Sequence, residues 1–332
     1  MLATTLAAVL WAGVTAYALF GGADFGAGFW DLVAGGARRG ERQRALIEHS
    51  IGPVWEANHV WLIFVLVVMW TGFPGLFGAV SSTLWIPLTA AALGVIARGS
   101  AFAFRKNVTA LWQRRLFGAA FAASSVITPF FLGAAAGGVA AGRVPPGVGH
   151  GNAVTSWWNP VSVLTGLLAV VACAYLAAVY LTADARRTGD DALAGQFRRR
   201  ALGAGLAAGV IAAAGLGTLH GDAPALAHGL LHRGLPLVIV SAVAGVAALA
   251  LLYQRHFVLA RVAGGLAVTA VIWGWAAAQY PYLLQGRLTI AGAAAAHSVL
   301  LATLISLLVG AVLLIPSLTW LYVIFQRDQP AS

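Results

Sequence analysis

The chain of 332 residues is 60% hydrophobic and only 9% charged, whereas soluble domains carry about 25% charged residues. This composition excludes an ordinary soluble enzyme and indicates a protein that crosses a membrane many times. A formal net charge of +10 does not indicate nucleic-acid binding, because the basic residues fall in short clusters between apolar runs. The single cysteine, Cys173, excludes disulfides within the chain and cysteine-ligated iron–sulfur clusters.

Nine apolar runs are long enough to cross a bilayer as helices, for which about 20 residues are needed. They lie at about residues 2–24, 45–71, 76–97, 116–135, 160–182, 201–219, 235–253, 259–280 and 297–325. The first run has no basic residues before it, so we expect it to remain as a helix rather than be cleaved as a signal peptide.

These runs predict an all-α, polytopic fold that forms a single integral membrane domain over residues 1–332. A first helical half, 1–182, and a second, 201–332, are separated by a polar connector at 183–200. Basic residues alternate between the loops, with seventeen at one set of helix ends and three at the other. The positive-inside rule then places the N-terminus outside and the C-terminus in the cytoplasm.

Glu56 is the most informative residue of the second run, SIGPVWEANHVWLIFVLVVMW (50–70). A charged side chain near the bilayer centre costs about 2.5 to 3.5 kcal/mol on insertion scales, so intramembrane acids are retained for a purpose. On one continuous helix His49, Gly52, Glu56 and His59 would form a polar stripe about 15 Å long. Such a stripe indicates either a proton path or a hydrogen-bonded pair that fixes helix packing, and the sequence leaves both open.

Asp24 lies among glycines in FGGADFGAGFWDL (20–32). Small residues at this spacing let a neighbouring helix approach closely, so we expect tight packing here. Asp24 itself is expected near the cytoplasmic end of the first helix. A salt bridge to Arg98 or Arg105, both in ARGSAFAFR (97–105), would account for it without any functional role.

The histidines bear on haem and metal binding. A bis-histidine haem needs two imidazoles from facing helices at one depth. His220, His228 and His232 cluster at the external side, but helix-end capping explains them as well as a metal does. We therefore assign no haem and no metal to this chain from its residues.

Several ordered motifs together resemble subunit II of the cytochrome bd-type quinol oxidases, in the branch that includes the cyanide-insensitive oxidases. The matching stretches are GGADFGAGFWDL, IGPVWEANHVWL, RGSAFAFR, AQYPYLLQGRLTI and PSLTWLYVIF. The resemblance implies nine transmembrane helices arranged as two four-helix bundles plus one additional helix. It also implies a heterodimer with subunit I in the bacterial cytoplasmic (inner) membrane, in contact with quinol and lipid.

In that family haems b and d and the quinol-oxidising loop belong to subunit I, so the resemblance implies no catalytic residue in this chain. Some members hold a structural quinone. An acidic position in a proton path from the cytoplasm matches Glu56, and we group with it the other polar residues of the motifs, His59, His49 and Asp24. Motif residues expected to be structural are Trp55, Asn58, Arg98, Arg105, Gln279 and Pro281.

Two positions depart from the family pattern. Gly21 stands where the first motif usually has an acid, and Ala103 stands where some relatives have a second proton-path carboxylate. The function we expect is that of a non-haem subunit of a quinol:oxygen oxidoreductase of the respiratory chain, inactive alone, which stabilises subunit I and contributes to proton uptake. The alternative is a secondary transporter or proton channel with Glu56 and Asp24 at its site, although inverted repeats are typical of transporters and the second half has no counterpart of PVWEANH.

Overall fold

The computed structural model describes residues 1–332 apart from 36–39, 52–54, 106–107, 109 and 328–332. The first membrane span is one long helix made of α1 (Leu2–Ala16), a π-helical turn (Tyr17–Gly21) and α2 (Gly22–Leu32). The remaining elements are α3 (Glu41–Ile51), α4 (Trp55–Gly72), α5 (Pro74–Thr83), α6 (Trp85–Arg105), α7 (Leu111–Ala140), α8 (Pro160–Arg187), α9 (Asp191–Asp222), α10 (Pro224–Leu231), α11 (Leu235–Tyr253), α12 (Phe257–Gln279), β1 (Tyr282–Leu284), β2 (Leu288–Thr289), α13 (Ile290–Ala293) and α14 (His297–Arg327).

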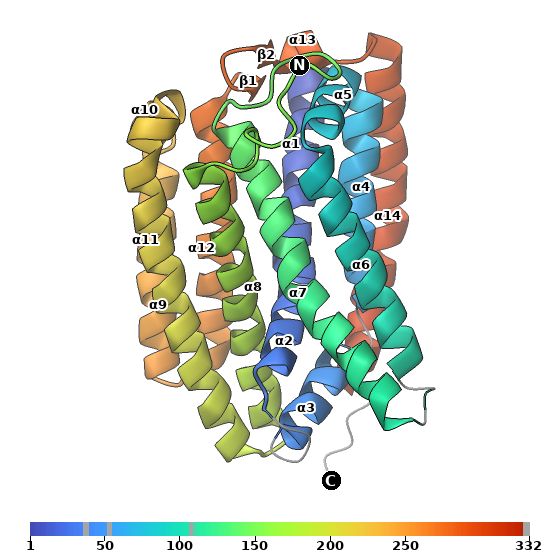
Figure 1. Ribbon diagram of the computed structural model, residues 1–332, viewed down its shortest axis with the longest axis vertical. Coiled ribbons are helices and arrows are strands. Elements are labelled where there is room, and N and C mark those ends of the chain that lie inside the picture. Colours follow the sequence, from blue (N-terminus) through green and yellow to red (C-terminus); the bar gives the residue numbers. More distant parts are fainter. Residues whose placement is uncertain (36–39, 52–54, 106–107, 109, 328–332) are drawn as a thin grey trace.

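The long helices run side by side along the long axis of the molecule (Figure 1). In the part of the chain that the structure describes, eight helices are long and apolar enough to cross a bilayer, and the bent pair α4–α5 brings the number to nine. The prediction of a polytopic helical membrane protein is thereby confirmed, and the predicted nine spans are reached among the described residues when α4 and α5 together count as one. The described residues also contain short elements that the sequence did not predict, among them the helices α10 and α13 and the antiparallel hairpin β1–β2 between α12 and α13.

The third span starts later than expected. The apolar run at 76–97 was predicted as one helix, but its beginning belongs to α5, which is bent by 118° from α4. Pro74 occupies the first turn of α5, and a proline without an N–H group cannot continue the hydrogen-bonded ladder of α4. The span itself begins at Trp85.

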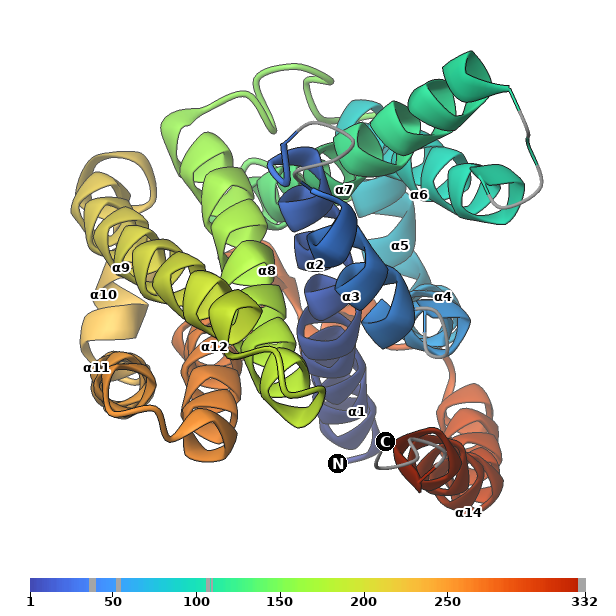
Figure 2. The same ribbon diagram turned by 90° about the horizontal axis from the view of Figure 1, so that it is seen from below.

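The structure describes the helix predicted over 45–71 as two helices. Helix α3 ends at Ile51 and α4 begins at Trp55, while Gly52 of the expected polar stripe lies outside the described residues. Seen along the long axis, α4 is end-on whereas α3 crosses obliquely below it (Figure 2). The alignment of His49 with Glu56, which assumed one continuous helix, therefore stays a prediction.

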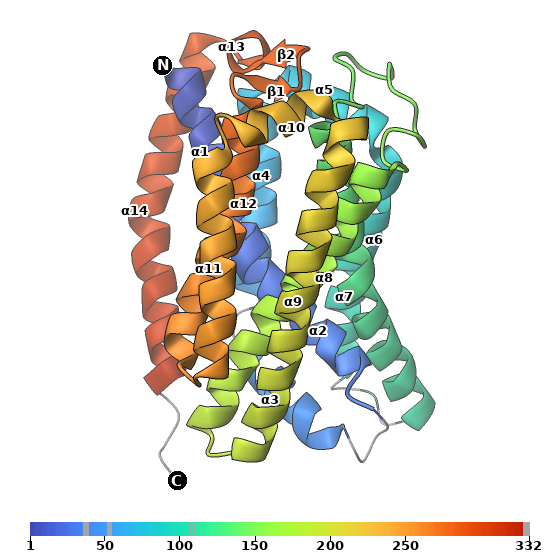
Figure 3. The same ribbon diagram turned by 90° about the vertical axis from the view of Figure 1, so that its left-hand side faces the viewer.

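Helix α8 is the centre of the packing. It contacts α7 and α2 on one side and α9 and α12 on the other, as the side view also shows (Figure 3). Its buried residues, among them Ala174, Leu176 and Leu181, form one hydrophobic cluster with Trp30 of α2 and Phe197 of α9. A second cluster joins α1, α4 and α5 to the β-hairpin at the opposite end of the bundle.

Candidate functional site

Asp24 lies inside the helix bundle with a set of polar partners from other helices. The side-chain amide of Asn58 in α4 donates a hydrogen bond of 2.9 Å to Oδ2 of Asp24. Nη2 of Arg98 in α6 donates a hydrogen bond of 2.7 Å to the backbone carbonyl of Asp24. Asp24, Asn58 and Arg98 are 3%, 4% and 1% exposed. We call these three residues together with Ser125 of α7 the Asp24–Arg98 cluster.

The guanidinium of Arg98 is held on several sides. Its Nη1 donates a hydrogen bond to Oγ of Ser125. The rings of Phe25 and Phe121 lie 5.1 and 4.3 Å from its Cζ atom, within the range at which an aromatic face attracts a cation. A buried charge is tolerated when it is paired and hydrogen-bonded, and the adjacent Asp24 supplies the opposite charge. This arrangement joins α2, α6 and α7 through one cation, and Asn58 connects α4 to it through Asp24.

The glycines around Asp24 allow this close approach, as the sequence predicted. A Cβ atom on Gly26 would lie 1.8 Å from the backbone oxygen of Cys173 in α8. One on Gly28 would lie 2.0 Å from Oγ of Ser125 and 2.8 Å from Nη1 of Arg98. Neither position has room for a larger residue, so α2 fits against α7 and α8 only with glycine there.

Of the two partners that the sequence offered for Asp24, Arg98 is the one that lies against it. The side chain of Arg105 falls outside the described part of the structure, as does that of Trp55. Asp24 is buried among the helices, and its place near the cytoplasmic end of the first span stays a prediction. Ser125 and Phe121 were not identified from the sequence, where they are one serine and one phenylalanine of a long apolar run.

Glu56 occupies the opposite side of α4 from Asn58. Its side chain is exposed on the surface of the chain. The residues that follow it at spacings of four and three, Val60, Ile63, Val67 and Trp70, are 44, 61, 50 and 66% exposed. These five residues form the outer stripe of α4, which is apolar except for the carboxylate at its start. Because this spacing repeats every 3.5 residues, it is the pattern with which one helix packs against another.

The two histidines of the expected polar stripe lie in different surroundings. His59 is half-buried, with its ring centre 5.7 Å from that of Phe25 and 6.3 Å from that of Tyr17. It therefore lies close to the Asp24–Arg98 cluster. His49 is exposed and lines an open pocket of about 370 Å³ at the end of α3, together with Arg42 and Asp190.

Gln279 and Pro281 belong to the far end of the bundle. Gln279 is buried, accepts a hydrogen bond of 2.7 Å from Nε1 of Trp275 and donates one of 2.7 Å to the backbone oxygen of Leu283. The carbonyl of Pro281 accepts a hydrogen bond from the backbone of Ile290. Both residues thus hold the β-hairpin on the end of α12, which agrees with a structural role.

A family model for cytochrome bd terminal oxidase subunit II matches residues 2–325. The chain belongs to the cytochrome bd terminal oxidase subunit II family. It is 33% identical to cytochrome bd ubiquinol oxidase subunit 2 of Bacillus subtilis (strain 168) over 128 residues, 39% of this chain and 36% of that relative. It is 26% identical to cytochrome bd-I ubiquinol oxidase subunit 2 of Escherichia coli (strain K12) over 172 residues, 50% of this chain and 44% of that relative.

These alignments cover less than half the length of each curated relative. A solved structure, that of the bd oxidase from Geobacillus thermodenitrificans, contains a chain that matches over 99% of both chains, with a TM-score of 0.76 and 25% identity. The resemblance inferred from the sequence motifs is confirmed, and the fold of the cytochrome bd subunit II family extends over the whole chain.

In this member of the subunit II family, the described residues contain no group of three or more histidine, cysteine or acidic side chains that could hold a metal ion. The rings of His228 and His232 stack with centres 3.9 Å apart. Nδ1 of His232 lies 2.8 Å from the backbone oxygen of His228, as expected for a residue that follows the end of α10. This geometry supports the helix-end explanation of these two histidines.

Proposed function

We propose that this chain is the non-haem subunit II of a quinol:oxygen oxidoreductase in the bacterial cytoplasmic membrane. In this proposal it holds a haem-bearing subunit I, where haems b and d and oxygen reduction belong, and it contributes protons from the cytoplasm. Family membership supports the class of complex. The names of the relatives in Bacillus subtilis and Escherichia coli, both ubiquinol oxidase subunits, support the substrate class.

The observation that carries the proposal is the outer stripe of α4 with Glu56 at its start. An ionisable side chain on a lipid-facing surface costs about 2.5 to 3.5 kcal/mol at the centre of a membrane helix and less toward the helix ends. Glu56 is the first residue of the candidate span Glu56–Gly72. A partner helix packed on the stripe would remove the carboxylate from lipid and leave it at the junction between the two subunits, where it could pass a proton to groups of the partner.

Helix α14 gives a second reason to place the partner subunit on the side of the bundle that carries the outer stripe of α4. It contacts α1 and α4 but leaves most of its circumference uncovered, and it lies beyond α4 at the edge of the bundle (Figure 2). Helices α14, α4 and α6 therefore share one side of the molecule (Figure 1). We place subunit I against this side.

The transporter alternative gains no support. Asp24 faces inward and is bound by Asn58, whereas Glu56 is exposed on the other side of α4. The two acids thus do not converge on one substrate site. Because Gly21 and Ala103 replace the acids found in some relatives, Glu56 is left as the acid of the proposed path at the subunit junction.

A matched pair of substitutions tests the partner face. Ile63 on α4 and Ile239 on α11 are 61 and 53% exposed, and the helices α4 and α11 lie on different sides of the bundle (Figure 1). With the chain tagged and coexpressed with its partner, Ile63→Asn should lower the amount of haem-bearing subunit that copurifies, while Ile239→Asn should not. Equal recovery of haem d with both variants would contradict the assignment of the partner to α4.

A further inference from the structure

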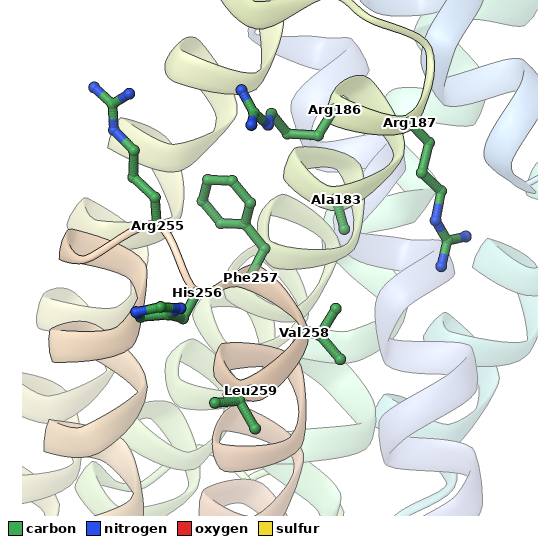
Figure 4. A pocket seen from close by; sticks show the side chains of 8 residues that line it. All are labelled: Ala183, Arg186, Arg187, Arg255, His256, Phe257, Val258 and Leu259. Atoms are coloured by element: carbon green, nitrogen blue, oxygen red, sulfur yellow. The ribbon is translucent and has the colours of Figure 1, made fainter.

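A second polar site lies at the end of the bundle, between the end of α8 and the turn that joins α11 to α12. It is an open pocket of about 420 Å³. Three arginines and one histidine, Arg186, Arg187, Arg255 and His256, line it beside the apolar side chains of the first turn of α12 (Figure 4). The combination of cationic and apolar lining is typical of a site for an anionic amphiphile.

The charge of this pocket is positive after its ion pairs are counted. Arg186 pairs with Asp191, and Nη1 of Arg187 lies 3.9 Å from Oδ1 of Asp184. Both pairs are solvent-exposed and therefore weak. Arg255 makes no ion pair with any residue that the structure describes. Figure 4 shows Arg186 and Arg255 on either side of the Phe257 ring, with Arg187 directed away on the other side of Ala183.

The backbone of Arg255 is in an unfavourable conformation. Its φ of 66° is the only positive value among the described non-glycine residues. The amide of Arg255 donates to the carbonyl of Leu252 and that of His256 to the carbonyl of Leu251, the helix-ending motif in which this position is usually glycine. A left-handed conformation costs an L-residue about 1–2 kcal/mol. A basic residue needed only for membrane orientation could occupy the neighbouring positions without this cost.

The pocket lies at the level where membrane spans end. The span of α8 ends at Arg187, that of α11 ends at Tyr253 and that of α12 begins at Phe257. Val258 and Val262 of α12 are 68 and 67% exposed, so an apolar surface runs from the pocket along the helix into the membrane. A ligand here would meet cations at its head and hydrocarbon-compatible side chains along its tail.

We propose that this pocket binds the phosphate headgroup of an anionic phospholipid, whose acyl chains lie along the exposed face of α12. Arg186 and Arg255 contact the phosphate from either side. The first N–H groups of α12, which receive no side-chain cap from His256, add donors suited to an anion. The site depends on the membrane-spanning fold and is independent of the proton role proposed for Glu56.

A site-specific crosslinking experiment tests this assignment. The complete oxidase complex is reconstituted in phosphatidylcholine nanodiscs that contain a photoactivatable phosphatidylglycerol or, in a parallel sample, its phosphatidylcholine counterpart. Mass spectrometry then measures the lipid attached to the peptide that includes residues 255–262. We expect phosphatidylglycerol to label this peptide more than phosphatidylcholine does, and excess inorganic phosphate not to displace it.

Arg255→Gly is the decisive variant, because glycine suits the backbone at this position while removing the guanidinium. The preference for phosphatidylglycerol should fall by roughly fivefold, the effect expected for one basic group near an anionic headgroup. Arg186→Gln should also lower the preference for phosphatidylglycerol. It serves as the test variant if the complex with Arg255→Gly does not assemble. Arg287→Gln, an exposed arginine at the opposite end of the bundle, is the control and should leave the labelling unchanged.

Three outcomes would overturn the proposal. Equal labelling by the two lipids would show that the pocket does not select an anionic head. Displacement of phosphatidylglycerol by inorganic phosphate would assign the site to a soluble phosphate instead. Unchanged labelling in both Arg255→Gly and Arg186→Gln would show that the arginines do not bind the lipid.

Discussion

The side-chain amide of Asn58 and the buried carboxylate of Asp24 are joined by a hydrogen bond of 2.9 Å between α4 and α2. Arg98 completes this contact from α6, through the backbone carbonyl of Asp24 and through the attraction between the two charges. Three helices far apart in the sequence are therefore fixed by one acid and one base. The stability of this end of the bundle should depend on keeping both.

Arg98→Gln tests this dependence. Removing one partner of a buried pair leaves an uncompensated charge and costs about 3–5 kcal/mol, so the purified complex should unfold at a markedly lower temperature. The double variant Asp24→Asn/Arg98→Gln removes both charges and should recover part of the loss. Thermal unfolding of the complex, followed with haem content on the same sample, measures both. A double variant no more stable than Arg98→Gln would show that charge compensation is not the reason.

Gly26→Ala tests the close contact of α2 with α8. The added Cβ would meet the backbone oxygen of Cys173 at 1.8 Å, and a backbone atom cannot rotate away as a side chain can. The helices must separate, which we expect to cost about 1–3 kcal/mol, as overpacking does. Gly203→Ala in α9 is the control, because nothing lies within 4 Å of its added Cβ. In thermal unfolding only the Gly26 variant should be destabilised.

The sequence predicted the spans well, because runs of apolar residues depend on the thickness of the membrane and hardly on tertiary contacts. It was less informative about breaks within such runs. Hydropathy does not distinguish a helix that crosses the membrane from one such as α5, bent by 118° at the end of α4. Pro74 was the available signal for that bend.

The candidate site was predicted in part. Asp24, Asn58 and Arg98 all stood in recognisable motifs, and the structure brings these three together. Ser125 stood in none, since its contact with Arg98 depends on how α7 packs against α6. The alignment of His49 with Glu56 stays a prediction, because helical phase can be followed only within one continuous helix and the structure describes α3 and α4 as two.

Asp190 provides a pH-dependent contribution outside the membrane spans. The backbone amide of Leu193 and the side chain of Arg42 bind its carboxylate and hold its pKa below the usual value. The charged form is thus favoured in the folded state, and this stabilisation is present above about pH 4, the usual pKa of an aspartate. It is lost as the pH falls through the lowered pKa.

Asp190→Asn should show this dependence, because asparagine still caps α9 but carries no charge. Wild type should be slightly more stable than the variant near neutral pH, and the difference should shrink as the solution is acidified. Unfolding temperatures measured from neutral pH down to about pH 3 test this. A difference that does not change with pH would assign the effect of the substitution to capping alone.

The orientation of the chain is testable with two exposed positions at opposite ends of the bundle, Glu41 in α3 and Val148 in the connection between α7 and α8. In a Cys173→Ser background, a membrane-impermeant thiol reagent added to intact cells should label Val148→Cys and not Glu41→Cys. The excess of basic residues at the α3 end is the reason, since such loops remain in the cytoplasm. Labelling of Glu41→Cys from outside would reverse the proposed orientation.

Glu56→Gln addresses the purpose of the carboxylate on the outer stripe of α4. Glutamine keeps the size and much of the hydrogen bonding of glutamate but cannot carry the titrating proton. If Glu56 relays protons, the variant should assemble with its haems and reduce oxygen more slowly, by up to about a hundredfold, the lower end of the effect of losing a positioned proton-transfer group. Glu56→Asp should be milder, because it retains an ionisable group one carbon shorter. Glu41→Gln, which removes an exposed acid of α3, is the control and should have wild-type turnover.

Turnover per haem d, with haem content measured on the same samples, separates the two roles that the sequence left open for Glu56. Slow turnover with full haem content assigns it to proton transfer. Loss of haem d from the purified complex would instead show that Glu56 holds the subunits together, since the outer stripe is the surface on which we place the partner. Wild-type turnover with full haem content would contradict both roles. The presence of a carboxylate on this face would then need another explanation.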